Sequence, residues 1–221
     1  MRMIERCDLN LIYANTSEET DRLIKAGANV NAKDIEREFT ALMEAKTAEQ
    51  SRLLIDAGAD INAKNYAGET ALMYNLHYGK SDEQTRFLIE SGADVNVKNY
   101  NGRTALMPAD SIEKIKILDE FGADINIVDN DGNKAIHLCR NNLEKMKALI
   151  RMGADVEAVG KDGKLPVHIT CEKRYHDIVK FLLEEAGVDP TIKDHFGHDA
   201  FHYAIGDAII LEILAPYRTD S

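Results

Sequence analysis

The sequence lacks the features that mark a secreted or membrane-embedded protein. No apolar run approaches the roughly 18 residues that a membrane-spanning helix requires. The N-terminal residues carry charge before any apolar stretch forms, so we expect no secretory signal. Cysteine is scarce too: Cys7, Cys139 and Cys171 have no Cys-x-x-Cys spacing, which argues against a zinc knuckle and a disulfide framework. We therefore expect a cytoplasmic protein in which the cysteines have no redox role.

Positive charge is also in short supply. The 221 residues include 27 Lys and Arg against 38 Asp and Glu, which gives a formal net charge of −11. The acidic excess is spread over both halves of the chain. Because an evenly acidic surface repels nucleic acid and anionic lipid, we expect neither a nucleic-acid nor a membrane partner. Such a surface suits a basic protein partner, or it serves solubility alone.

No group of residues has the pattern of a catalytic or cofactor-binding site. The glycines are isolated, so no Gly-rich phosphate loop forms, and no serine lies in a Gly-x-Ser-x-Gly elbow. Met43, Met73 and Met107 are equivalent positions of a repeat, which favours core packing over a soft-metal site. We expect a protein that is not an enzyme and that binds no cofactor.

What the chain does contain is a repeat of about 33 residues. The segment Gly-Ala-Asp-Ile-Asn at 58–62 has near-copies that start at Gly27, Gly92, Gly122, Gly153 and, more degenerate, Gly187. A second motif follows each of these glycines after 12 or 13 residues. It reads Ala-Leu-Met after Thr40, Thr70 and Thr104, and it is degenerate after Lys134, Leu165 and Asp199. A period of this length predicts one supersecondary unit stacked on itself.

Each repeat has a constant half and a variable half. The constant half, from glycine to the second motif, has the pattern of an extended hairpin with a polar tip, and the threonine suits a helix N-cap. The variable half predicts two antiparallel helices. Capping boxes open the second helix, and a glycine in the left-handed conformation ends it. The expected boxes pair Thr16 with Glu19, Thr47 with Gln50, Ser81 with Gln84, Asp110 with Glu113, and Asn141 with Glu144.

This order of hairpin, helix, turn and helix resembles the ankyrin repeat over essentially the whole chain. The resemblance implies an all-α repeat solenoid of about seven helix-turn-helix units with projecting β-hairpin loops, in a single domain. The expected repeats are 1–32 (an N-terminal cap), 33–63, 64–97, 98–127, 128–158, 159–192 and 193–221 (a C-terminal cap). Because terminal repeats must cover an otherwise bare apolar face, the atypical ends lead us to expect a complete array.

The sequence departs from the family pattern, which has Thr-Pro-Leu-His in the second motif. The first three motifs keep the threonine and carry methionine where histidine belongs, whereas the last three carry His137, His168 and His202 without the threonine. The array therefore resembles two different halves joined near residue 128. The first helix is expected to be short after Thr40, Thr104 and Lys134. It is expected to be full-length after Thr70 and Leu165, where residues 77–80 and 172–175 should project.

The resemblance implies a non-catalytic module that is monomeric on its own and binds another protein through a concave face of hairpin tips and first helices. We expect a cluster of Tyr66, Tyr100, Arg103, His77 and Tyr78. The candidate partner-binding residues are Tyr66, His77, Tyr78, Tyr100, Asn101, Arg103, Lys161, Glu172, Lys173, His195 and Phe196. A sharper alternative of the same class is an inhibitor or immunity-type protein that masks a basic partner.

Histidine supports one alternative from another class. The equivalent residues His137, His168 and His202 favour a structural role, because equivalent atoms of stacked repeats lie about 10 Å apart. His195, His198 and His202 are closer together in the sequence and straddle a hairpin tip and a helix start. The alternative is thus a metal-dependent protein that uses these three residues.

Overall fold

The computed structural model describes residues 6–78 and 81–218, and within these ranges the chain forms helices joined by turns, without a β-strand. This is the all-α repeat architecture that the sequence predicts, with hairpin loops that consist of turns. The chain divides into two compact units, an N-terminal unit of residues 1–123 and a C-terminal unit of residues 124–221. The boundary lies close to residue 128, where the second motif changes from methionine to histidine.

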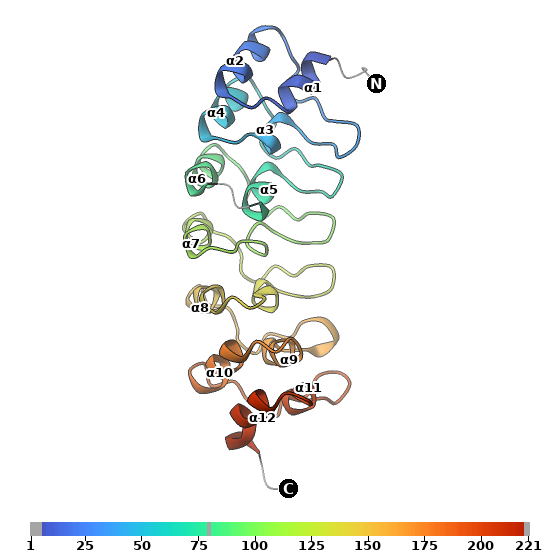
Figure 1. Ribbon diagram of the computed structural model, residues 1–221, viewed down its shortest axis with the longest axis vertical. Coiled ribbons are helices and arrows are strands. Elements are labelled where there is room, and N and C mark those ends of the chain that lie inside the picture. The colour runs from blue at the N-terminus through green and yellow to red at the C-terminus, as the bar shows by residue number, and fades with distance from the viewer. Residues whose placement is uncertain (1–5, 79–80, 219–221) are drawn as a thin grey trace. The chain divides into compact units, whose positions relative to one another are not determined.

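The N-terminal unit is built from pairs of helices. The pairs are α1 (Arg6–Ile12) with α2 (Ser17–Lys25), α3 (Ala41–Glu44) with α4 (Ala48–Asp56), and α5 (Ala71–His77) with α6 (Asp82–Glu90); α7 (Ile112–Glu120) follows. Within this unit the first helices α1, α3 and α5 pack in sequence, and so do the second helices α2, α4, α6 and α7 (Figure 1). Each repeat therefore covers the apolar side of the one before it.

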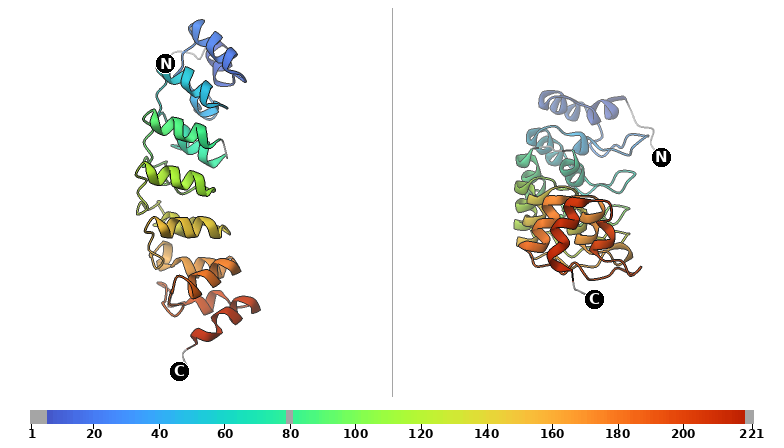
Figure 2. Two further views of the ribbon diagram at one scale, coloured as in Figure 1. Left: turned by 90° about the vertical axis from the view of Figure 1, so that its left-hand side faces the viewer. Right: turned by 60° about the horizontal axis from the view of Figure 1, so that its bottom comes forward.

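The C-terminal unit repeats the same plan. It contains η1 (Ala135–Leu138), α8 (Leu143–Arg151), η2 (Lys161–Gly163), α9 (Pro166–Glu172), α10 (His176–Glu184), α11 (Ala200–Tyr203), α12 (Ala208–Leu214) and η3 (Ala215–Tyr217). Here η1, α9 and α11 pack in sequence, as do α8, α10 and α12 (Figure 2). The turn that contains η2 belongs to a hairpin loop.

An apolar stripe sets the register of the second helices. The seventh residue after the N-cap is a buried leucine in α2, α4, α6, α7 and α8, namely Leu23, Leu54, Leu88, Leu118 and Leu149. Thr16, Thr47 and Ser81 cap their helices as predicted, each accepting the backbone N–H three residues on. Because each leucine must face the core, the position of the N-cap seven residues before it is fixed as well.

Two predicted caps are wrong by one residue. Helix α7 is capped by Ser111, which accepts from Lys114 N at 3.2 Å, and not by Asp110. Helix α8 is likewise capped by Asn142 and not by Asn141. A cap at Asp110 would rotate the helix so that Glu113 entered the buried third position and Leu118 left the stripe. Burial of an unpaired carboxylate is costly, so the apolar pattern overrides the capping box.

The lengths of the first helices agree with the prediction. Helix α3 and η1 have four residues each, and turns replace the helix after Thr104, whereas α5 and α9 have seven residues. The expected threonine cap is observed at Thr70, which accepts from Met73 N at 3.4 Å. Thr40 makes no such cap bond. Of the two expected projections, residues 172–174 are exposed, and part of the other, 79–80, lies outside the described residues.

The constant half is explained by contacts between neighbouring repeats. Every glycine that begins a Gly-Ala-Asp segment has a positive φ, as predicted for a left-handed helix end. Asn31 then bridges to the next repeat, since its Nδ2 donates to Gly58 O at 2.9 Å and its Oδ1 accepts from Asp60 N at 2.7 Å. Asn62 makes the same pair of bonds one repeat later. The motif recurs because these copies make the same hydrogen bonds to the next repeat.

Candidate functional site

The hairpin tips are held rigid by backbone hydrogen bonds. Asn65 N donates to Glu69 O at 3.0 Å, and the Asn65 side chain accepts the amides of Ala67 and Glu69. Neighbouring tips are also tied together, because Tyr66 N donates to Arg37 O and Tyr100 N donates to Ala67 O. The second residue of each tip is therefore fixed by its backbone, while its side chain is left available for contact.

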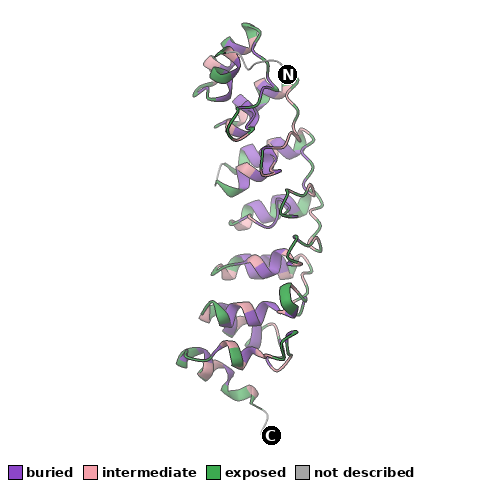
Figure 3. Ribbon diagram, turned by 90° about the vertical axis from the view of Figure 1, so that its right-hand side faces the viewer, coloured by how far each residue is buried: buried purple, intermediate pink, exposed green. Residues whose placement is uncertain are grey.

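The predicted tip residues of the N-terminal unit lie on the surface. Tyr66 and Tyr100 are 62% and 64% exposed, and Ile35, on the preceding tip, is 85% exposed. The Tyr100 ring packs against Gly68, where a Cβ atom would lie 2.7 Å from Tyr100 Cδ1. Asn101 and Arg103 are exposed on the same tip as Tyr100. Figure 3 shows how little of these loops is buried.

Two residues of the expected aromatic cluster, His77 and Tyr78, lie in a group of packed rings. Tyr78 is 60% exposed, and its ring lies 4.2 Å from that of Tyr74 and 4.7 Å from that of His77, between centroids. Tyr74 in turn meets the buried ring of Phe39 edge-on at 4.9 Å. These contacts join Tyr78 to the first helix α5 and to the preceding tip. Tyr74 and Phe39 are functional candidates that the sequence prediction missed.

An ion pair with an aromatic partner adjoins this cluster. The Tyr13 hydroxyl donates to Asp34 Oδ2 at 2.7 Å and accepts from Arg37 Nη2 at 3.2 Å. The Arg37 guanidinium lies over the Phe39 ring at 4.2 Å and reaches Glu44 at 3.4 Å. Burial acts to raise the pKa of Asp34, but hydrogen bonds from Arg37 N and Tyr13 outweigh it, so the pKa is lowered. The carboxylate is thus charged at neutral pH.

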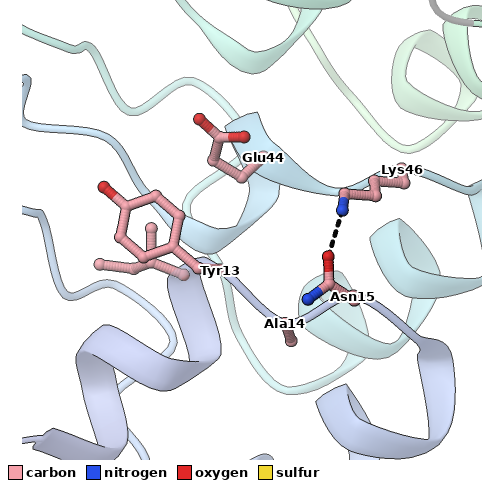
Figure 4. A pocket seen from close by; sticks show the side chains of 6 residues that line it. Tyr13, Ala14, Asn15, Glu44 and Lys46 are labelled. Atoms are coloured by element: carbon pink, nitrogen blue, oxygen red, sulfur yellow. Dashed lines mark hydrogen bonds between the residues drawn. The ribbon is translucent and has the colours of Figure 1, made fainter.

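A small hollow opens beside Tyr13. It has a volume of about 250 Å³ and is lined by Ile12, Tyr13, Ala14, Asn15, Glu44 and Lys46 (Figure 4). The Lys46 ammonium donates to Asn15 Oδ1 within it. Pockets for small-molecule ligands usually measure roughly 300–1,000 Å³. The hollow therefore suits a single side chain of a partner better than a small-molecule ligand.

The remaining predicted residues belong to the C-terminal unit and are exposed. Lys161 pairs with Asp131 at 2.8 Å, and Glu172 pairs with Lys164 at 2.7 Å and with Lys173 at 3.6 Å. His195 packs against Gly163. The Phe196 side chain is 64% exposed at its tip. The eleven candidates therefore divide between the two units: Tyr66, His77, Tyr78, Tyr100, Asn101 and Arg103 in the N-terminal unit, and Lys161, Glu172, Lys173, His195 and Phe196 in the C-terminal unit.

Two of the three equivalent histidines have the predicted structural role. In each, Nδ1 accepts a backbone N–H of its own helix start, and Nε2 donates to a carbonyl of the following turn. His137 uses Lys134 N and Ala158 O, and His168 uses Leu165 N and Ile192 O. Burial lowers the pKa of both rings. His202 is exposed instead.

The geometry does not support the predicted metal alternative. The rings of His198 and His202 are stacked at 3.6 Å with an angle of 6° between their planes. Nitrogen lone pairs lie in the ring plane, so two parallel rings do not direct them at one ion about 2 Å from both. Among residues 6–78 and 81–218, no three His, Cys, Asp or Glu side chains are placed to hold a metal ion.

Two of the three cysteines lie in the core. Cys139 and Cys171 are buried and unpaired, and burial raises the pKa of each thiol to about 12. A thiol with so high a pKa is a poor nucleophile, because the thiolate is the reactive form. These residues fill space in the core, as the methionines do: Met43, Met73 and Met107 are at most 3% exposed. In the described part of the chain, no helix is long and apolar enough to cross a membrane.

Comparison with known proteins gives the family. The family model "Ankyrin repeats (3 copies)" matches residues 10–99, 47–129, 76–159, 109–194 and 139–220. The crystal structure of the ankyrin repeat domain of Bcl-3, described as a unique member of the IkappaB protein family, is similar with a TM-score of 0.77 and 25% identity. The match covers 97% of this chain and 100% of that one. No curated protein matches by sequence. The chain belongs to the ankyrin-repeat family and, with it, to the protein–protein interaction modules.

Proposed function

We propose that the chain binds a partner protein, without catalysing a reaction, through the face formed by its hairpin tips and first helices, called the inner face below. The observation that carries the proposal is the exposure of aromatic side chains whose backbone is held by hydrogen bonds on this face of the N-terminal unit. Tyr66, Tyr78 and Tyr100 are each at least 60% exposed. The backbone N–H of each donates to a carbonyl, and the Tyr78 ring also packs on Tyr74.

Exposed tyrosines on a rigid support are typical anchors of protein interfaces. A tyrosine contributes a large contact area for little loss of side-chain entropy, and its hydroxyl is hydrated in the free protein. Energy in an interface concentrates in few such residues. The candidates of the C-terminal unit, among them Phe196, are proposed as contacts of that unit by itself. The free, buried thiols of Cys139 and Cys171 favour a reducing compartment, in keeping with a cytoplasmic location.

The test compares two triple variants of the full chain. One carries Tyr66→Ala, Tyr78→Ala and Tyr100→Ala on the inner face. The control carries Arg52→Ala, Glu83→Ala and Phe121→Ala, which change side chains on or beside the second helices. Each protein is immobilised and exposed to an extract of the native host, and the recovered proteins are quantified by mass spectrometry. Circular dichroism checks that both variants stay folded.

We expect a partner that the wild type and the control recover and that the tyrosine variant recovers at least about tenfold less, since interface anchors contribute about 1.4 kcal/mol or more in sum. If both variants recover as much of the partner as the wild type does, the placement of the site on the inner face of the N-terminal unit is refuted. If both recover less of it and to the same extent, the loss is a general effect of surface substitutions.

A further inference from the structure

We propose that the C-terminal unit binds an acidic segment of the partner, with a carboxylate across the stacked rings of His198 and His202 and an apolar side chain against Phe196. This inference rests on the proposed function and adds the chemistry of the partner at this unit. It follows from the ring geometry, from the carboxylates that are already bonded within the unit, and from the charge around the last two hairpin tips.

Four aromatic side chains form a group at the last hairpin tip and in α11. They are Phe196, His198, His202 and Tyr203, called the ring group below. The ring centroids of Phe196 and His198 lie 6.2 Å apart, and those of His198 and His202 lie 3.6 Å apart. The Tyr203 ring lies 5.5 Å from that of His202. Because Phe196 is 64% exposed and His202 is exposed as well, the ring group presents an apolar ring and an imidazole pair to a partner.

The stacked histidines are suited to a carboxylate. Their planes differ by only 6°, so the edges of the two rings, where the ring nitrogens lie, are side by side. Two imidazolium charges at this distance repel each other. A carboxylate has two oxygens and can accept an N–H from each ring, which offsets the repulsion. Binding of an acidic side chain should therefore be coupled to proton uptake and strengthen as the pH falls.

The two aspartates next to the ring group already have donors within the unit. Asp194 is 6% exposed; its Oδ1 accepts two backbone amides of the tip, each at 2.9 Å, and its Oδ2 accepts the Tyr203 hydroxyl. Burial acts to raise the pKa of Asp194, but these hydrogen bonds and the charge of His198 lower it to about 2. Asp199 Oδ1 accepts His202 N at 3.0 Å as the cap of α11. None of these bonds uses a ring nitrogen of His198 or His202.

Two cations lie near the ring group. The Lys164 ammonium lies 4.3 Å from the ring centroid of Tyr203 and pairs with Glu172 at 2.7 Å. The Arg218 guanidinium lies 5.9 Å from the ring centroid of Phe201, the residue before His202. The negative charge of Glu172 is thus balanced by Lys164, and Arg218 favours an acidic segment.

The last two hairpin tips and their first helices lack the acidic excess of the whole chain. Residues 159–174 and 191–205 hold five Lys and Arg and four Asp and Glu, whereas the whole chain has 27 and 38. His195, His198 and His202 add positive charge to the second segment as the pH falls through the range in which histidine titrates. An acidic segment therefore meets less repulsion here than the net charge of the chain implies.

The spacing of the ring group suits an extended segment. Residues two apart in a strand point to the same side and lie about 6.6 Å from each other. The 6.2 Å between the ring centroids of Phe196 and His198 is close to this value. The expected segment thus carries an apolar and an acidic residue two positions apart. A basic segment would add charge to the protonated pair, and an apolar one would cover imidazole N–H groups without an acceptor.

The experiment measures binding of fluorescein-labelled nine-residue probes by fluorescence polarisation at about pH 6 and about pH 7.5. The first probe has leucine and glutamate two positions apart, with serine and glycine elsewhere. Two matched probes carry glutamine or lysine in place of glutamate, so that the label and the leucine stay the same. The full chain is compared as wild type, as His198→Gln with His202→Gln, as Phe196→Ala, and as a control with His176→Gln.

The control removes a titrating ring of the same unit outside the ring group. His176 is the first residue of α10, and its Nε2 lies 2.8 Å from Asp207 Oδ2. A glutamine amide can also donate to this carboxylate, so the control should stay within about twofold of the wild type at both pH values.

We expect the wild type to bind the glutamate probe at least about fivefold more tightly near pH 6 than near pH 7.5, and more weakly as salt rises. The variant at His198 and His202 should bind at least about fivefold more weakly near pH 6 and lose most of the pH dependence. Phe196→Ala should bind about threefold more weakly at both pH values, because the apolar contact is lost. Circular dichroism confirms that each variant is folded.

The inference is overturned if the wild type does not bind the glutamate probe near pH 6, or if the glutamine or lysine probe binds as tightly. It is also overturned if the variant at His198 and His202 keeps the pH dependence of the wild type, which would assign that dependence to the net charge of the whole chain. Each of these results leaves the proposed function intact when the capture of a partner still depends on Tyr66, Tyr78 and Tyr100. Loss of that dependence instead would refute the proposed function.

Discussion

At the scale of single residues, His137 and His168 link the fold to pH. Each ring is buried as the neutral form, because Nδ1 accepts a backbone N–H and a charged ring has no lone pair there. The equivalent positions of the N-terminal unit carry methionine, which does not titrate. In the pH range where histidine titrates, the C-terminal unit should therefore respond to acid through these two side chains, which have no counterpart at the methionine positions of the N-terminal unit.

The sign of this response follows from the lowered pKa values. The unfolded chain takes up a proton on each histidine near pH 6.5, whereas the folded chain resists protonation until a lower pH. The free energy of unfolding is thus highest above about pH 6.5 and falls as the pH drops from there through the folded pKa. Each unit of difference in pKa contributes about 1.4 kcal/mol.

Urea unfolding followed by circular dichroism between about pH 8 and about pH 5 measures this effect. His168→Gln should lower the free energy of unfolding at high pH and flatten its dependence on pH, since an amide does not titrate in this range. The control is Met107→Leu, which changes the equivalent buried position of the N-terminal unit without a titrating group and should leave the slope as it is. An unchanged slope in His168→Gln would contradict the assignment.

At the scale of the elements, the hairpin tips depend on glycines that neighbouring tips approach closely. Gly68 has a φ of +76°, and a Cβ atom there would lie 2.6 Å from Tyr100 N. Gly122 has nearly the same φ, +77°, and a Cβ atom there would meet no other atom within 4 Å. Comparing alanine substitutions at Gly68 and Gly122 therefore separates the strain of a positive φ from the effect of the contact with Tyr100.

We expect Gly122→Ala to cost about 1 kcal/mol of stability, from the left-handed conformation alone. Gly68→Ala should cost about 2–3 kcal/mol, because Tyr100 must also move. Urea unfolding of the two variants beside the wild type gives both values. Similar costs would mean that the contact between the tips contributes nothing to the fold.

The helices show which features the sequence could predict. The short first helices after Thr40 and Lys134 follow from chain length alone, and the leucine stripe follows from periodicity. The caps at Ser111 and Asn142 did not follow from motif matching, since the capping pattern at Asp110 competes locally with a stripe that only packing enforces. Counting seven residues back from Leu118 would have found Ser111.

The candidate site was predictable only in part. Exposed tip residues such as Tyr66 follow from the position of the turn. The cluster of Tyr13, Arg37, Phe39 and Tyr74 joins three repeats, and the tip that carries Arg37 has one residue more than the other tips. Unlike the contacts of Asn31 and Asn62, these contacts involve residue types that change from repeat to repeat, so no local pattern predicts them. The available signal was the position of Tyr13 and Tyr74 immediately before the small buried residues Ala14 and Asn75.

At the scale of the whole molecule, the repeated and unrepeated parts of the chain have different tasks. The Gly-Ala-Asp segments connect neighbouring repeats, since Asn31 and Asn62 make the same hydrogen bonds to successive turns. The differences between repeats include the exposed tip residues, the lengths of the first helices and the aromatic side chains on them. We place partner recognition in these differences.

Photo-crosslinking can locate the bound partner on the surface of the chain. Benzoylphenylalanine is placed, one site at a time, at Tyr66, Tyr78 and Tyr100 on the inner face and at Phe121, a 37% exposed residue at the end of α7. Each protein is irradiated with the partner recovered by affinity capture. We expect covalent adducts from the three inner-face positions and none from Phe121. Adducts from Phe121, with none from the tyrosine positions, would contradict recognition through the inner face.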